Sequence, residues 1–129
     1  MNDTHAALWG PEAARVRAAR ITAYQQQLRQ VRGLAFAGYE SLWQWSVDHP
    51  GEFWDSIWEY FAVVGERGSG PALARAAMPG AEWFPGAALN YVEQVFRHAT
   101  SSRPAIVAGD ESGELVEIGW RELERRVAA

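Results

Sequence analysis

Two groups of residues near the middle of the sequence have side-chain types that catalysis and metal binding use. His49 and Glu52 are three positions apart, which is close to one helical turn, so both could face the same metal ion. One turn with two ligands does not make a metal site, and we favour a helix cap for His49. Ser46, Asp48 and His49 are the residue types of a catalytic triad, but residues this close in sequence rarely present all three roles together.

Three carboxylates and one cationic pair are the next candidates. We interpret Asp110, Glu111 and Glu114, which fall in an expected hairpin loop, as solvated turn residues. Arg97 and His98 end an expected helix, where positive charge interacts favourably with the helix dipole. A cationic helix end can also bind phosphate, and this alternative stays open. We therefore assign no catalytic, cofactor-binding or metal-ligating residue from the sequence.

A glycine-rich stretch could act as a phosphate cradle. Gly65, Gly68 and Gly70 supply the glycines, but their spacing matches neither G-x-G-x-x-G nor the phosphate loop of nucleotide-binding proteins. No clear strand precedes them, and Pro71 follows directly. We interpret this stretch as a surface connection.

The composition excludes several classes of function. All twelve basic residues are arginine and there is no cysteine, so this sequence supplies no catalytic lysine, disulfide or thiolate metal site. The net charge is −4, with five arginines against seven acidic residues in residues 1–65 and seven against nine in residues 66–129. Neither half is basic, which argues against nucleic acid as a partner.

The 129 residues and 48 % hydrophobic content suit one globular segment with a real core. No apolar stretch approaches the ~20 residues needed to cross a bilayer. The first residues lack the apolar region of a signal peptide. We therefore expect a cytoplasmic protein.

The hydrophobic pattern predicts an α+β fold that is mostly helical, with about five helices and one β-hairpin. Residues 11–32 predict a leading helix, which either lies on a globular body or drives oligomerisation. Its apolar stripe consists of Ile21, Tyr24, Leu28 and Val31. Residues 38–64 predict a helical pair, and the second helix begins at Pro50. The apolar face of that second helix consists of Phe53, Ile57, Trp58, Phe61 and Val64.

Residues 65–86 predict a loop that ends in the turn at Pro85 and Gly86. The aromatic residues directly before this turn, Trp83 and Phe84, are expected to be anchored in the core.

Residues 87–129 predict a helix, a β-hairpin and the start of a last helix. Asn90 and Glu93 have the spacing of a capping box, in which each side chain bonds the backbone N–H of the other. The helix they open would bury Tyr91, Val92, Val95 and Phe96. The last helix, with Trp120, Leu123 and Val127 on one side, reaches Ala129 without a cap, as expected of a truncated chain.

The order of several motifs resembles a known family. The motifs are "YESLWQWSVDHPGEFWDSIWEYF", "MPGAEWFPGAALNYVEQVFRH" and "PAIVAGDESGELVEIGWREL". In this order they resemble the N-terminal region of acyl-CoA synthetases of the adenylate-forming superfamily. The finer pattern, "LWGPEAARV" followed by "ITAY", "WQWSV" and "MPGAEWFPGAALNY", is similar to acetoacetate–CoA ligases. The resemblance extends from about Leu8 to Val127.

The resemblance implies a parent enzyme of lipid metabolism, an AMP-forming acid–thiol ligase. Such an enzyme converts acetoacetate, ATP and CoA to acetoacetyl-CoA, AMP and pyrophosphate, with Mg²⁺ assisting. The family's phosphate-binding loop, adenylate contacts and catalytic lysine would lie outside residues 1–129, so we expect no cofactor within this chain and no activity of this segment alone. Gly119, before Trp120, stands where the family more often has a hydroxyl cap.

Two interpretations of the function follow. In the first, residues 1–129 are a single N-terminal segment that packs against the remainder of the adenylation domain or, alone, self-associates as a homo-oligomer through exposed aromatic surface. In the second, the chain is a free-standing helical module that binds a partner through residues 11–32 or its aromatic face. We prefer the first because the motifs occur in the order that the family has them.

Overall fold

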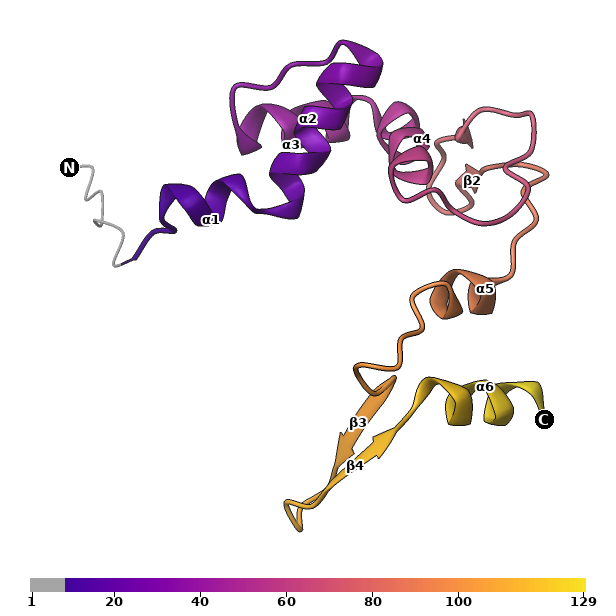
Figure 1. The fold of residues 1–129 in the computed structure, drawn as a ribbon. Coiled ribbons are helices and arrows are strands. Elements are labelled where there is room, and N and C mark those ends of the chain that lie inside the picture. The colour runs from indigo at the N-terminus through magenta and orange to yellow at the C-terminus, as the bar shows by residue number, and fades with distance from the viewer. Residues whose placement is uncertain (1–8) are drawn as a thin grey trace. The chain divides into compact units, whose positions relative to one another are not determined.

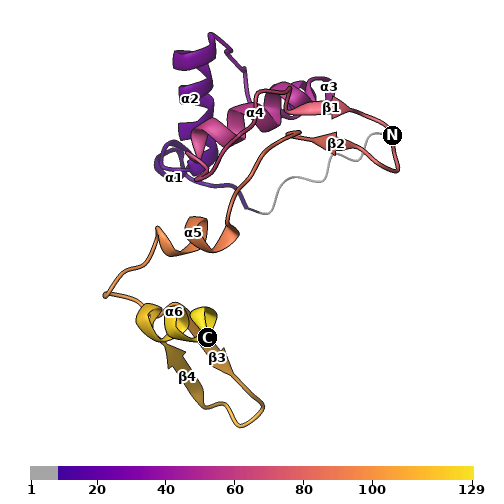
Figure 2. The same ribbon diagram turned by 90° about the vertical axis from the view of Figure 1, so that its right-hand side faces the viewer.

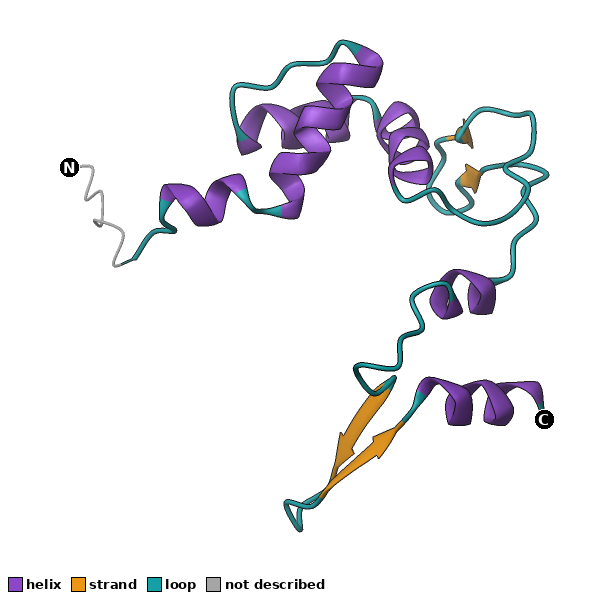
Figure 3. Ribbon diagram, in the orientation of Figure 1, coloured by secondary structure: helices purple, strands orange, loops and turns teal. Residues whose placement is uncertain are grey.

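The computed structural model describes residues 9–129. Within them the fold is mostly helical α+β, as predicted, with six helices and two separate two-stranded antiparallel sheets (Figures 1 and 3). The chain divides into two compact units, and each is described by itself. The first unit consists of the residues up to Ala62 together with Pro71–Trp83, and the second of Val63–Gly70 together with Phe84–Ala129. The prediction of a single N-terminal segment stays a prediction.

Four helices and one strand pair form the first unit: α1 (Ala13–Arg17), α2 (Arg20–Arg32), α3 (Tyr39–Asp48), α4 (Pro50–Tyr60), β1 (Leu73–Arg75) and β2 (Glu82–Trp83). Its core is small and aromatic. The buried residues Tyr24, Leu28 and Leu42 form its centre, where α2, α3 and α4 meet (Figure 2). The half-buried residues packed around that centre are Leu34, Phe36, Trp45, Phe53, Ile57 and Tyr60.

The predicted leading helix at residues 11–32 is two helices. The chain leaves helical geometry between Arg17 and Arg20, and the hydroxyl of Thr22 donates to the carbonyl of Val16 at 2.6 Å, across the break. No proline or glycine marks this position, so the sequence carries no strong signal for it. The apolar stripe is also narrower than predicted, since only Tyr24 and Leu28 of its four residues are buried.

The end of α4 differs from the prediction too. Pro50 occupies the first turn, as expected, but the helix ends at Tyr60 and Ala62 then takes a positive φ of 45°. This change of direction leaves Phe61 and Val64 exposed, so both were wrongly assigned to the buried face. The buried residue of α4 is polar, Ser56.

The predicted loop at residues 65–86 contains the β1–β2 strand pair, with Leu73 opposite Trp83. Trp83 was expected in the core and is instead 41 % exposed. Its ring contacts Trp54 edge to face, with 6.2 Å between ring centroids. Phe84, which belongs to the second unit, is half-buried.

The second unit contains α5 (Tyr91–Phe96), β3 (Ile106–Gly109), β4 (Leu115–Ile118) and α6 (Trp120–Ala128). The predicted hairpin is confirmed, with Ile106 opposite Ile118. Asn90 is the N-cap of α5, as predicted. Its side chain accepts the N–H of Val92, however, and not that of Glu93 as the predicted capping box requires. The buried face of α5 was also predicted too wide, since Val92 is 36 % exposed and Tyr91 is 74 % exposed. In the part of the chain that the structure describes, no helix has the length and apolar character to cross a membrane.

Candidate functional site

The triad-like residues in α3 each have a partner in their own helix. The hydroxyl of Ser46 donates to the carbonyl of Trp43 at 2.7 Å. A carboxylate oxygen of Asp48 accepts the amide of Gln44 at 2.9 Å. These bonds direct Ser46 and Asp48 to their own helix and not to each other, so the structure does not assemble a nucleophile with a base here.

His49 lies at the junction of α3 and α4, as the sequence indicated. Its Nδ1 is 3.4 Å from Oε1 of Glu52, and both side chains are more than half exposed. Over residues 9–129 no group of three or more histidine, cysteine, aspartate or glutamate side chains could hold a metal ion. The pair is therefore a surface contact between neighbouring turns.

The carboxylates of the β3–β4 loop are turn residues, as predicted. Oδ1 of Asp110 accepts the N–H of Ser112 at 2.9 Å and also its hydroxyl, and Gly113 follows with a φ of 79°. The hydrogen bond from the Ser112 side chain is the largest cause that lowers the pKa of Asp110. Glu111 and Glu114 are exposed in the same loop.

Arg97 is the C-cap of α5, at the negative end of the helix dipole. Its Nη1 donates to Oε1 of Gln94 at 3.2 Å. The neighbouring His98 is exposed. An anion site at this pair stays an untested alternative.

The glycine-rich stretch pairs with a second segment of its own unit. Glu66 and Ala88 exchange two backbone hydrogen bonds of 2.8 Å each. A Cβ on Gly65 would lie 2.6 Å from Cβ of Leu89, and one on Gly68 would lie 2.5 Å from the carbonyl oxygen of Pro85. The glycines are therefore needed because two backbones approach closely, so the prediction of a plain surface connection was too simple.

Arg67 fixes this paired loop. Its Nη1 donates to the carbonyl of Gly70 at 3.0 Å, and its guanidinium lies 5.4 Å from the ring centroid of Phe84. The guanidinium of Arg67 is thus held by the Gly70 carbonyl oxygen and the Phe84 ring.

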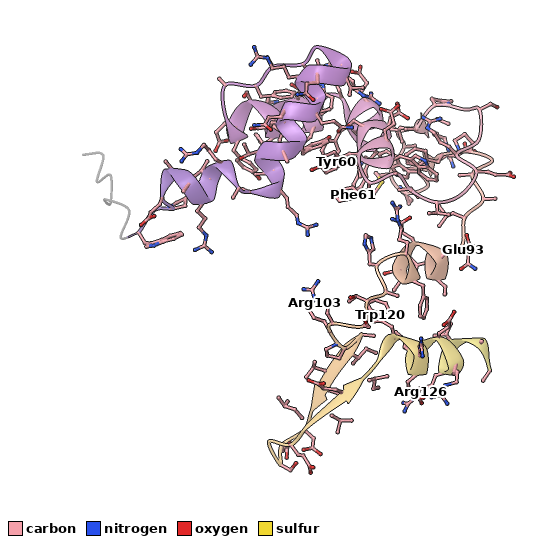
Figure 4. All side chains as sticks on the ribbon, in the orientation of Figure 1. Tyr60, Phe61, Glu93, Arg103, Trp120 and Arg126 are labelled. Carbon is pink, nitrogen blue, oxygen red and sulfur yellow. The ribbon has the colours of Figure 1, made fainter. Side chains whose placement is uncertain are left out.

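A groove in the second unit was not predicted. It has a volume of about 800 Å³ and lies between the segment before β3 and the start of α6. Its lining residues are Ala99, Thr100, Ser101, Ser102, Arg103, Pro104, Glu117, Gly119, Trp120 and Arg121. Figure 4 labels Arg103, on the loop leading to β3, and Trp120, at the first turn of α6. The sequence signal for this groove was the run of three hydroxyl residues, 100–102, directly before Arg103. Sequence spacing alone does not show that this run lines the same groove as Arg121.

The groove is lined by more positive than negative groups. Arg103 and Arg121 are both exposed, and within residues 9–129 neither forms an ion pair. Glu117 is the one carboxylate in the lining. The hydroxyl oxygens of Thr100 and Ser102 lie 3.0 Å apart and bond each other.

The first turn of α6 adds N–H groups that have no partner within residues 9–129. Its N-cap is Gly119, which has no side chain to accept a helical N–H. Glu122, in the first turn, interacts with Arg125 and Arg126, which lower the pKa of its carboxyl, with the hydrogen bond from Arg126 the largest cause. The indole nitrogen of Trp120 is buried and, among the described residues, is the one buried side-chain N or O atom without a hydrogen-bond partner.

The chain is similar to several known proteins. Residues 39–95 match the family described as the acetyl-coenzyme A synthetase N-terminus. The solved acetoacetyl-CoA synthetase from Streptomyces lividans is 40 % identical, with a TM-score of 0.81 over 93 % of this chain and 19 % of that protein. The acetoacetyl-coenzyme A synthetase of Rhizobium meliloti (strain 1021) is 31 % identical over 121 residues, and the acetoacetyl-CoA synthetase of Xenopus tropicalis is 29 % identical over 126.

Each of these two curated relatives is matched over 94 % of this chain, and the chain spans 18 % of the length of each. The similarity thus covers nearly all of this sequence and about a fifth of the enzymes it resembles. The resemblance drawn from the motifs is confirmed. Residues 39–95 thus match the acetyl-coenzyme A synthetase N-terminus family, and the chain as a whole is similar in sequence and fold to the N-terminal region of acetoacetyl-CoA synthetases.

Proposed function

We propose that this chain is the N-terminal structural region of an AMP-forming acetoacetate–CoA ligase and has no ligase activity by itself. The complete reaction would convert acetoacetate, ATP and CoA to acetoacetyl-CoA, AMP and pyrophosphate, with Mg²⁺ assisting, in the cytoplasm. The observation that carries the proposal is the 40 % identity and the TM-score of 0.81 with the Streptomyces lividans enzyme over 93 % of this chain.

The chemistry of adenylation supports the part of the proposal that concerns inactivity. A ligase must neutralise the triphosphate and hold the substrate carboxylate in line with the α-phosphate, which requires positioned cations and backbone donors. This sequence contains no lysine, and Arg67 and Phe84 are engaged with the one glycine-rich loop. ATP, Mg²⁺ and CoA would therefore be bound by other parts of the enzyme.

The structural role rests on exposed aromatic surface in the first unit. Trp54 and Trp83 contact each other and are 47 % and 41 % exposed. Trp43 and Val47, one turn apart in α3, are 48 % and 55 % exposed. Large exposed apolar side chains in contact are typical of a surface that another protein surface covers. We propose that the remainder of the enzyme covers them.

The same surface favours the second candidate function, a module that binds a partner or a second copy of itself. Light scattering on the purified chain, together with binding of a dye specific for exposed apolar surface, tests this. A dimer whose dissociation accompanies Trp54→Ser and Trp83→Ser would support self-association. A monomer that binds no dye would contradict both self-association and the exposed surface on which the structural role rests.

The test of the proposed function is a chimera. The region of the Streptomyces lividans enzyme that this chain matches is replaced by this chain, and acetoacetyl-CoA formation is measured. Retained activity supports the proposal. A soluble, folded chimera without activity would contradict it, and so would acyl-adenylate formation by the 129-residue chain alone.

A further inference from the structure

The groove beside the start of α6 brings anion-binding groups together from two segments of the second unit. One segment, residues 99–104, supplies hydroxyl groups and a guanidinium, and the other, residues 117–121, supplies a guanidinium and the start of a helix. We propose that this groove binds a phosphate group, either as the free ion or as a phosphate monoester. The proposal does not depend on the ligase function.

The two arginines are available to an anion. A guanidinium normally pairs with a carboxylate of its own protein where one is in reach, and it binds phosphate oxygens in a two-bond geometry. Arg103 and Arg121 form no ion pair within residues 9–129 and line the same groove. They are opposed there by the single carboxylate of Glu117. With two guanidinium groups and one carboxylate in its lining, the groove is net positive.

The start of α6 adds donors that a tetrahedral oxyanion can use. The first backbone N–H groups of a helix have no partner within the helix, and the helix dipole makes this end positive. Gly119 offers no side chain to accept them, and the carboxylate of Glu122 interacts with Arg125 and Arg126. Trp120 also lines the groove, and its buried indole N–H has no hydrogen-bond partner among the described residues.

The chemistry of the lining favours phosphate over a simple halide. Thr100, Ser101 and Ser102 add hydroxyls, so the groove offers donors of three geometries, which suit an ion with several oxygens. The volume of about 800 Å³ exceeds what a bare ion fills and falls in the range of small-molecule sites. The groove can thus admit a monoester as well as the free ion.

The test follows the indole N–H signal of Trp120 in a two-dimensional ¹⁵N–¹H spectrum of the 129-residue chain. Trp120→Phe assigns the signal. Inorganic phosphate is titrated at pH 7 and constant ionic strength, with chloride as the matched salt. We expect a saturable shift with phosphate and none with chloride. Arg103→Gln and Arg121→Gln should each weaken binding by about tenfold, the loss typical of one charge-assisted hydrogen bond.

Glu117→Gln should tighten binding because it removes the opposing charge, whereas Arg29→Gln on α2, outside the groove, should leave it unchanged. Calorimetry with the same variants gives a second readout that does not depend on Trp120. A repeat with adenosine monophosphate distinguishes the sources, since tighter binding than phosphate indicates a monoester and equal binding the free ion. An equal shift with chloride, or unchanged affinity in Arg103→Gln together with Arg121→Gln, would overturn the proposal without bearing on the ligase function.

Discussion

The hydroxyl oxygens of Tyr24 and Ser56 lie 2.5 Å apart inside the first unit, although 32 positions separate them in the sequence. Oγ of Ser56 also donates to the carbonyl of Phe53 at 2.7 Å. Because a serine hydroxyl has one hydrogen, that bond fixes the direction of the other: Tyr24 donates and Ser56 accepts. This buried bond links α2 to α4 at the centre of the core.

The Tyr24–Ser56 bond is expected to contribute measurably to stability. Ser56→Ala leaves a buried phenol without its acceptor and should lower the free energy of unfolding by about 1–3 kcal/mol. Tyr24→Phe should cost a similar amount. The double variant should cost less than the sum, because neither partner is then left unpaired. Urea unfolding of the four proteins gives this cycle, and additive losses would show that the bond contributes nothing of its own.

Tyr24 is also expected to make stability fall at alkaline pH. Burial raises the pKa of Tyr24 above its ordinary 10.0, and the charge of Arg32 only partly offsets this. The unfolded chain therefore loses the proton at lower pH than the folded chain. This contribution is fully present below the unfolded pKa and is lost as pH rises through the folded pKa. The stability of Tyr24→Phe should fall less steeply above pH ~10 than that of the parent chain, and equal slopes would contradict this.

Arg32 is expected to stabilise the packing of the end of α2 against α4 through two ion pairs. Its Nη2 lies 2.9 Å from Oδ2 of Asp55 and 2.8 Å from Oε2 of Glu59. Burial alone would lower the pKa of Arg32, but the hydrogen bonds with Glu59 and Asp55 outweigh it and the pKa is raised. Because Glu59 is half exposed, Arg32→Gln should cost only about 1 kcal/mol, and less in ~1 M NaCl.

The matched control is Arg29→Gln, one turn earlier on α2. That arginine is exposed and has no ion pair within the described residues. Its replacement should change stability by less than about 0.5 kcal/mol. Equal losses in the two variants would show that the charge of the helix end matters and the specific pairing does not.

Gly68 and Gly86 allow two causes of a glycine requirement to be measured separately, a positive φ and the close approach of another backbone segment. Both have a positive φ, of 74° and 77°, but only at Gly68 would a Cβ meet a neighbour, the carbonyl oxygen of Pro85 at 2.5 Å. Gly86→Ala should cost about 1 kcal/mol from backbone strain, and Gly68→Ala about 2–4 kcal/mol because the paired segments must also separate. Hydrogen exchange at the Glu66 and Ala88 amides, which bond each other's carbonyls, measures this opening directly. Exchange rates that rise equally in both variants would contradict the close approach.

The parts of the fold that the sequence predicted well are those set by local pattern. Pro50 and the β3–β4 turn were located because each has a fixed backbone requirement. The prediction failed where distant contacts decide, as in the break between Arg17 and Arg20, which no helix-breaking residue marks.

The candidate site shows the same division. The residue types around Ser46 and His49 suggested chemistry, and helix-internal hydrogen bonds or a contact in the next turn account for them. The groove at residues 99–104 and 117–121 was missed because its two arginines come together only when the hairpin brings Ile106 opposite Ile118. The pairing of Tyr24 with Ser56 depends on how α2 packs against α4, and a polar residue on the buried side of a helix carries no signal of its partner.

The most direct test of the proposed function is acetoacetate-dependent release of pyrophosphate from ATP. It is measured for the 129-residue chain alone and for the Streptomyces lividans acetoacetyl-CoA synthetase in which this chain replaces the matched region. We expect no release by the chain alone and release by the chimera at a rate comparable with that of the parent enzyme. Release by the chain alone, or a folded chimera that releases none, would contradict the proposed function.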